Sequence, residues 1–197
     1  LKIPTSRTLF WPFISESRKL KTVPCDHPNV LCARFAEDQY IIMDYYEGFV
    51  DLLQWRNCVS EKYYLRKPVV HTPEIVSIIA TIFRQIAEVV RFLHRNGIVH
   101  RDIKPANILV KWDIPMIIDF GLVMTNKDKP DALAGSPSFV PGEIWKMKLT
   151  RDLLKTKLTA EEIYSAYFGA DVYAIGVTLF QIIQNSSPFH LSGNDWG

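Results

Sequence analysis

Cysteine, net charge and long apolar runs are all scarce in this 197-residue sequence. The three cysteines form no Cys-x-x-Cys pair, and this odd, scattered set predicts reduced thiols in an intracellular protein of the cytoplasm or nucleus. A formal net charge of only +2 argues against a protein dedicated to nucleic-acid binding. The longest apolar stretch, Val172–Ile183, is too short to span a bilayer, so we expect no membrane segment.

Glycine-rich phosphate loops are also missing. The nine glycines include no Gly-x-Gly-x-x-Gly arrangement, so no loop of the kind that covers nucleotide phosphates is present. No methionine opens the sequence, and Leu1–Ile3 has the apolar character of the inside of a strand. We therefore expect the sequence to begin within a strand of its domain.

A small strand-containing part is predicted before residues 44–48, and a mostly helical part after them. Gln39–Met43 is a short β-rich run that suits a buried strand, and residues 57–73 have the polar character of a loop. Apolar residues then recur at helical spacing from Glu74 to Asn96 until Gly97 ends the pattern. Two strands, a long loop and a second apolar helix are expected at Ile108–Lys111, Met116–Ile118, Gly121–Gly142 and Asp171–Gln184. This order indicates the α+β class.

Two motifs carry the chemistry. His100–Val110 reads HRDIKPANILV, and Ile118–Leu122 reads IDFGL. The pattern H-R-D-x-K-P-x-N, followed by D-F-G seventeen residues after its aspartate, resembles the catalytic loop and metal-binding segment of eukaryotic-type protein kinases. The resemblance implies a two-lobed kinase fold that uses Mg-ATP to phosphorylate protein substrates on hydroxyl groups.

The resemblance also implies a role for each polar residue of the motifs. Asp102 would orient the proton of the attacking hydroxyl, and Lys104 would lie beside the γ-phosphate, as in serine/threonine kinases. Asn107 and Asp119 would hold Mg²⁺ through oxygen ligands. Phosphoryl transfer needs such positioning and neutralisation of charge, because the transferred group is densely negative.

The segment after these motifs resembles the activation segment of the same family. Gly135–Glu143 reads GSPSFVPGE, where the family has G-T-P-x-Y-x-A-P-E, so Ser136 would contact the catalytic aspartate and lysine. Arg101 is of the type that commonly engages a phosphorylated activation loop. Because no Ser, Thr or Tyr lies between Thr125 and Ser136, we expect activation without phosphorylation of this loop.

Further positions follow from the same resemblance. His100 and Phe120 would pack together in an apolar column, and Asp171 would brace the catalytic loop. The spacing from Glu143 to Asp171 is longer than usual for the family. The additional residues, 146–167, are expected to be helical at Ala160–Tyr167 and are either a solvated elaboration or a docking surface for a partner.

The resemblance divides the chain into residues 1–43 as an incomplete small lobe, 44–48 as the hinge and 49–197 as a large lobe without its last helices. At the hinge, Met43 would be the gatekeeper, while Asp44 and Tyr46 would offer backbone groups to adenine and Leu109 would form the floor beneath it. Lys2 and Glu16 would form the ion pair that contacts the ATP phosphates.

Three functions are compatible with these residues. An active serine/threonine kinase is favoured because the aspartate, lysine and asparagine of the catalytic loop are retained together with Asp119. A pseudokinase or scaffold that binds partners without efficient phosphoryl transfer is the alternative, because the family's A-P-E has become P-G-E and the small lobe is uncertain. A small-molecule phosphotransferase of the same fold normally lacks the complete HRDIKP and GSPSF segments.

Overall fold

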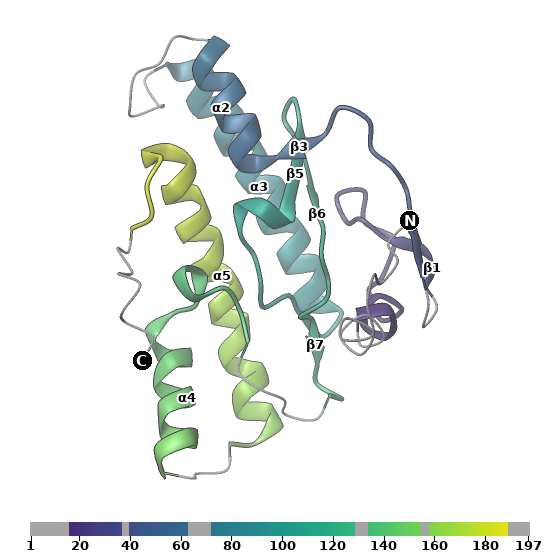
Figure 1. The fold of residues 1–197 in the computed structure, drawn as a ribbon, viewed down its shortest axis with the longest axis vertical. Coiled ribbons are helices and arrows are strands. Elements are labelled where there is room, and N and C mark those ends of the chain that lie inside the picture. Colours follow the sequence, from purple (N-terminus) through teal and green to yellow (C-terminus); the bar gives the residue numbers. More distant parts are fainter. Residues whose placement is uncertain (1–15, 37–39, 63–71, 129–133, 155–157, 189–197) are drawn as a thin grey trace.

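The computed structural model describes residues 16–36, 40–62, 72–128, 134–154 and 158–188. Within these ranges, two long helices, α3 (Pro73–Arg95) and α5 (Ala160–Gln184), accompany three small antiparallel sheets (Figure 1). The combination confirms the α+β class. Lys2 lies outside the described residues.

One sheet belongs to the N-terminal part of the chain. Strand β1 (Ala33–Ala36) pairs with β2 (Ile41–Met43), and both lie beside the helical residues 16–20, apart from the long helices (Figure 1). Residues 44–48 then lead away from β2 to the next sheet. They connect the two sheets in the sequence, and their role as a hinge stays a prediction.

The other two sheets frame the catalytic motifs. The larger one has the order β3-β5-β6, formed by Val50–Asp51, Ile108–Lys111 and Ile114–Ile117. The smaller one pairs β4 (Ile98–Val99) with β7 (Met124–Thr125). Because β4 precedes HRD and β5 follows it, the catalytic loop is fixed at both of its ends.

Helix α3 agrees with its prediction within one residue at each end. The Thr72 side chain accepts a hydrogen bond from the Ile75 N–H, and Pro73 occupies the first turn, where a missing N–H costs nothing. The helix ends at Asn96, and Gly97 follows with φ +71°, a conformation that favours glycine. Its apolar side chains repeat on one buried face (Ile75, Ile79, Ile82, Phe83, Ile86, Val89, Val90, Leu93).

Helix α5 is longer than predicted. The sequence pattern indicated separate helical pieces at Ala160–Tyr167 and Asp171–Gln184, but one helix of 25 residues covers both. It begins at a capping box in which Thr159 and Glu162 bond each other's backbone, and these hydrogen bonds lower the pKa of Glu162 below its ordinary value. No proline interrupts the helix, and Gly169 is tolerated inside it.

The length of α5 bears on the expectation of no membrane segment, which stays a prediction. By length and composition alone, this helix could cross a bilayer, although the central helix of a folded domain meets the same criteria. Within its apolar window 39% of the residues are buried in the protein. Asp171, in the middle of the helix, is 1% exposed and contacts the catalytic loop. The apolar stretch Val172–Ile183 is thus the C-terminal part of a longer helix.

Two further helices differ from the sequence expectation. Helix α2 (Leu52–Lys62) extends into the predicted loop at 57–73. The Asp51 carboxylate caps its start by accepting from the N–H groups of Leu53 and Gln54. Helix α4 (Gly142–Leu154) and the start of α5 occupy the additional residues 146–167. Ile163 and Tyr167 of α5 are buried against Ile144 of α4, so part of this segment is core rather than a solvated elaboration.

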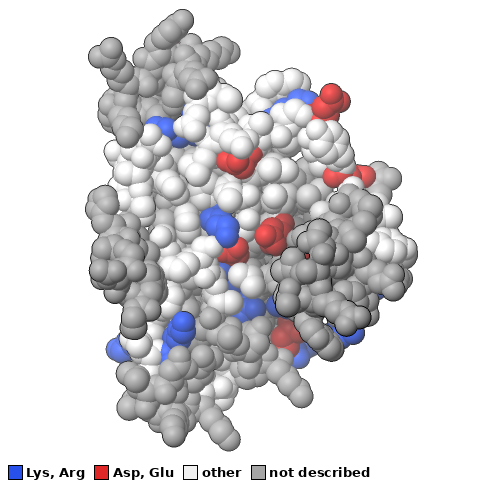
Figure 2. Space-filling model, in the orientation of Figure 1, with Lys and Arg blue, Asp and Glu red and all other residues white. Residues whose placement is uncertain are grey.

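Charged side chains of both signs are mixed on the face shown in Figure 2. Among the described residues of this face, acidic and basic groups lie next to one another near its middle, within largely uncharged surface. This distribution agrees with the small net charge.

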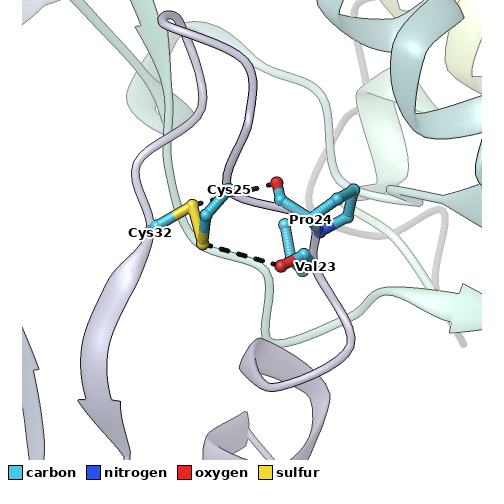
Figure 3. The surroundings of a disulfide bond; sticks show 4 residues. All are labelled: Val23, Pro24, Cys25 and Cys32. Carbon is cyan, nitrogen blue, oxygen red and sulfur yellow. Dashed lines mark hydrogen bonds between the residues drawn. A yellow bond between two sulfur atoms is a disulfide. The ribbon is translucent and has the colours of Figure 1, made fainter.

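The cysteine prediction was wrong for two of the three thiols. Cys25 and Cys32 form a disulfide, because the intervening residues fold back and bring their Cα atoms within 5.6 Å (Figure 3). The sulfur atoms lie 3.7 and 3.8 Å from the carbonyl oxygens of Val23 and Pro24, which could accept hydrogen bonds only from reduced thiols. Cys58 is unpaired and exposed.

Candidate active site

The HRD segment adopts a constrained backbone conformation between β4 and β5. Arg101 has φ +67°, which is uncommon for a residue with a side chain, and Pro105–Asn107 forms a short 3-10 helix. The polypeptide therefore turns sharply around Asp102, whose residue surface is only 7% exposed.

Both carboxylate oxygens of Asp102 accept hydrogen bonds. Lys104 Nζ lies 2.8 Å from Oδ2, and Asn107 Nδ2 lies 2.9 Å from the same oxygen. Ser136 donates its hydroxyl to Oδ1 at 2.7 Å. These donors fix the carboxylate in one orientation.

Lys104 joins the catalytic loop to the activation segment. Its ammonium lies 2.8 Å from Asp102 and donates to the Ser136 hydroxyl at 2.7 Å. The side chain is 26% exposed, so the charge remains accessible at the surface of the cluster. The contacts of Ser136 with both residues confirm the geometry expected from GSPSF.

Asn107 and Asp119 present oxygen atoms that suit Mg²⁺. The amide nitrogen of Asn107 donates to the backbone carbonyl and to Oδ2 of Asp102, and the amide oxygen takes no part in these two hydrogen bonds. Its backbone carbonyl accepts from the N–H of Ile118, so it lies next to the residue before Asp119. Asp119 is exposed and has φ +61°, with one oxygen accepting from Gly121 N–H at 3.2 Å.

This set of donors suits Mg²⁺ better than it suits a cation whose ligands all come from the protein. Within the described ranges, no three His, Cys, Asp or Glu side chains cluster as a metal site. Mg²⁺ is usually held by one or two carboxylates together with water and substrate phosphates, which is what one carboxylate and one amide oxygen would allow.

Asp171 of α5 braces the catalytic loop from beneath. Its two oxygens accept from the backbone N–H groups of His100 and Arg101, both at 2.8 Å. His94 of α3 adds a third contact, with Nε2 2.9 Å from Oδ2. The buried carboxylate thereby joins both long helices to HRD, as predicted for Asp171 but not for His94.

His100 and Phe120 pack together in the interior, as expected. Their ring centroids are 5.1 Å apart, and both residues are 0% exposed. Burial lowers the pKa of His100 below its ordinary value, although the nearby carboxylates, Asp171 foremost, oppose this effect. The ring is therefore neutral at pH 7 and has a structural role.

Arg101 is directed inward and is only 4% exposed. Its Nε donates to the carbonyl of Leu122 at 2.6 Å. Its guanidinium carbon lies 5.3 Å from the ring centroid of Tyr167, within the range of a cation–π contact. Sequence reasoning did not identify Tyr167, because a tyrosine in a helical pattern gives no signal of what its hydroxyl contacts.

Gly135 brings the activation segment close to the catalytic loop. Its φ is +132°, and a Cβ at this position would stand 2.9 Å from the Arg101 carbonyl oxygen and 2.6 Å from Val140 Cγ2. No side chain fits there without displacement of the backbone. The glycine therefore permits Ser136 to reach Asp102.

The residues predicted for nucleotide binding lie within residues 44–48 and on either side of that segment. Met43 ends β2, and Tyr46 contacts Phe49 with ring centroids 5.5 Å apart, whereas Leu109 lies in β5 opposite Asp51. Asp44 is half-buried between the two sheets. Their role towards adenine stays a prediction.

Glu16 lies close to the metal-binding motif. Its side-chain carbon Cγ is 3.7 Å from the position that a Cβ on Gly121 would take. The carboxylate is therefore near Asp119, whose Oδ1 is 3.2 Å from the same position, and the role of Glu16 beside a phosphate-binding lysine stays a prediction. The proposed partner, Lys2, falls outside the described residues.

Known proteins resemble this chain over most of its length. Residues 12–196 match the family model described as the protein kinase domain. The chain is 28% identical to the serine/threonine-protein kinase KSP1 of Saccharomyces cerevisiae over 84% of its residues, which cover 14% of that protein. It is 32% identical to the serine/threonine-protein kinase ssp1 of Schizosaccharomyces pombe over 85% of its residues, which cover 24% of that protein.

A third relative is named for the protein on which it acts. The phosphorylase b kinase gamma catalytic chain, liver/testis isoform, of Bos taurus is 34% identical over 55% of the chain and 25% of its own length. The chain spans a quarter or less of the length of each of these relatives. Together with the geometry of the HRD and DFG motifs, the match over residues 12–196 shows that this chain belongs to the protein kinase domain family.

Proposed function

We propose that this chain supplies the catalytic part of a serine/threonine protein kinase, which transfers the γ-phosphoryl group of Mg-ATP to hydroxyl groups of protein substrates. One observation supports this proposal most directly. Asp102 accepts a serine hydroxyl at 2.7 Å while Lys104 contacts both groups. This cluster already holds a hydroxyl, a carboxylate and a cation together, which are the groups that the reaction requires.

Asp102 and Lys104 would share the work of the transfer. The carboxylate of Asp102 orients the substrate hydroxyl and accepts its proton as the oxygen attacks the γ-phosphorus. Lys104 offsets the negative charge that spreads over the transferred group. Asn107 keeps the carboxylate in place through its amide nitrogen.

Asn107 and Asp119 would hold the magnesium ion. When bound, Mg²⁺ neutralises charge on the nucleotide phosphates. Asp119 offers its exposed carboxylate, and the Asn107 amide oxygen is the neighbouring donor. Met43, Asp44, Tyr46 and Leu109 would hold the adenine, and Lys2 with Glu16 would contact the phosphates.

Transfer of radiolabel from [γ-³²P]ATP to a generic protein substrate tests this function. We expect Mg²⁺-dependent labelling of serine or threonine that Asp119→Asn reduces at least about 100-fold, because the substitution removes the charged metal ligand. Asp128→Asn is the matched control, since Asp128 is an exposed carboxylate of the same segment. Labelling that persists unchanged in Asp119→Asn would falsify the assignment.

The same experiment separates the alternatives. Nucleotide binding without transfer to any protein would identify the pseudokinase or scaffold, and labelling of small molecules alone would identify the small-molecule phosphotransferase.

Residues 146–167 remain a candidate docking surface for a protein partner, since Leu149 of α4 is 58% exposed. An intracellular location is also part of the proposal, although the argument from unpaired thiols now applies only to Cys58.

A further inference from the structure

The N-terminal half of α5 reaches the activation segment through Tyr167. The Tyr167 hydroxyl accepts from the N–H of Ala134 at 2.7 Å and donates to the carbonyl of the same residue at 2.7 Å. One hydroxyl thus satisfies both backbone groups of Ala134. Tyr167 is 1% exposed, so these bonds are shielded from water.

The body of Tyr167 is fixed by its surroundings. Its ring belongs to a buried apolar cluster formed by α4, α5, β4 and β7, whose buried members also include Val99, Met124, Ile144, Ile163 and Ala170. The Arg101 guanidinium lies over the ring at 5.3 Å. With the ring held on several sides, the hydroxyl has a defined position from which to hold Ala134.

Ala134 is close enough to the catalytic cluster for its position to matter. Only Gly135 separates it from Ser136, and Gly135 is confined between the Arg101 carbonyl and Val140. Ser136 in turn contacts Asp102 through its backbone N–H at 3.2 Å and its hydroxyl at 2.7 Å. A shift of Ala134 would therefore move Ser136 relative to the carboxylate.

We infer that Tyr167 is a positioning residue for the phosphoryl-transfer site, which holds the Gly135–Ser136 segment in place from α5. This inference rests on the proposed function and adds to it a residue outside the catalytic motifs. Tyr167 contacts neither Asp102 nor Lys104 in any hydrogen bond of the described residues; it acts through Ala134. The bonds come from the folded core, so they order the segment without a phosphate on it.

The inference predicts which kinetic parameters depend on Tyr167. Loss of its hydroxyl should loosen the segment that faces the protein substrate, so KM for the protein substrate should rise and kcat should fall. Asp119 and the hinge lie elsewhere, so KM for ATP should stay within about twofold of the original value. A general loss of folded protein would instead lower kcat and leave both KM values unchanged.

Tyr167→Phe is the informative variant, because it removes only the hydroxyl and keeps the ring beneath Arg101. Tyr164→Phe is the matched control: Tyr164 is one turn earlier on α5 and packs edge-on against Phe168. Among the described residues, its hydroxyl makes no hydrogen bond. Both variants should bind nucleotide as the original protein does, which a thermal-shift assay with Mg-ADP can verify.

The two hydrogen bonds between the Tyr167 hydroxyl and the backbone of Ala134 are called the clamp. Hydrogen exchange measures the clamp independently of activity. We expect the Ala134 amide to exchange about tenfold faster in Tyr167→Phe than in Tyr164→Phe or the original protein, since its acceptor is gone. We also expect kcat/KM for a protein substrate to fall about tenfold in Tyr167→Phe alone.

The outcomes separate the inference from the proposed function. Faster exchange in Tyr167→Phe, in a protein that transfers no phosphate at all, would support the clamp and overturn the kinase assignment. An active protein in which Tyr167→Phe matches Tyr164→Phe in both exchange and kcat/KM would overturn the clamp and leave the kinase assignment in place.

Discussion

Ser136 and Asp102 are 34 residues apart in the sequence, yet the serine contacts the Oδ1 atom of the aspartate twice, through its hydroxyl at 2.7 Å and its backbone N–H at 3.2 Å. The contact joins the activation segment to the catalytic loop directly. The aspartate is thereby oriented by a residue that belongs to the surface on which a protein substrate would bind.

Ser136→Ala should lower kcat/KM for a protein substrate about five- to tenfold, because Lys104 and Asp102 each lose a hydrogen-bond partner. Ser136→Thr keeps the hydroxyl and should retain most of the activity. Steady-state kinetics of both variants with one peptide provide the measurement. Equal losses in the two variants would show that the hydroxyl is not what matters.

Asp171→Asn should destabilise the fold by about 2–4 kcal/mol, because a neutral amide replaces a buried carboxylate that accepts from His100 N–H, Arg101 N–H and His94. Urea unfolding followed by circular dichroism measures the change. Asp128→Asn, at an exposed carboxylate, should cost less than about 1 kcal/mol. Similar values for the two variants would contradict the bracing role of Asp171.

Gly135→Ala and Gly169→Ala should change stability in opposite directions. At Gly135 a Cβ would meet the Arg101 carbonyl at 2.9 Å, and φ is +132°, so we expect a loss of about 2 kcal/mol or more and a fall in activity. At Gly169, inside α5, no atom lies within 4 Å, so alanine should add about 0.5–1 kcal/mol. Thermal unfolding of both variants tests the pair, and a stabilised Gly135→Ala would refute the close approach.

Stability should depend on pH through His100. Burial lowers its pKa in the folded state below the ordinary 6.5, so its contribution is fully present above pH 6.5 and is lost as pH falls towards the folded-state value. Because a single proton is involved, the free energy of unfolding changes through His100 by at most about 1.4 kcal/mol per pH unit. His100→Phe should remove this contribution, which urea titrations between pH 5 and 7.5 would show as a flatter profile. An unchanged profile would exclude His100 as the cause.

Reduction of the Cys25–Cys32 bond should lower the free energy of unfolding by about 2 kcal/mol, because the bond closes a short loop and restricts the unfolded chain. Urea unfolding with and without dithiothreitol measures this difference. Cys25→Ser/Cys32→Ser should match the reduced protein and show no response to dithiothreitol. Cys58→Ser, at the exposed and unpaired cysteine, should retain the full response.

Local sequence patterns were sufficient to predict an element where its own residues specify its start, its end and its buried face. Helix α3 carries its cap at Thr72, its stop at Gly97 and eight buried apolar residues at helical spacing, so its bounds could be predicted closely. The polar motif residues were identifiable because their types and spacing match those of the family. The contacts among Asp102, Lys104 and Ser136 followed from that resemblance.

Contacts between distant segments left no such pattern. Tyr167 and His94 occupy ordinary helical positions, and only the packing of α5 against its neighbours shows what their polar atoms reach. Cys25 and Cys32 were misinterpreted because their pairing depends on how residues 25–32 fold back. The pieces at Ala160–Tyr167 and Asp171–Gln184 were predicted separately, whereas the structure joins them in α5.

Tyr167 and Asp171 are four residues apart on α5, a spacing that places both side chains on one face of the helix. One of them holds the activation segment and the other holds the catalytic loop. The alignment of these two loops is therefore specified by a single helical turn, and one residue inserted between them would rotate one contact by about 100° relative to the other. This four-residue interval therefore has to keep its length for both contacts to form.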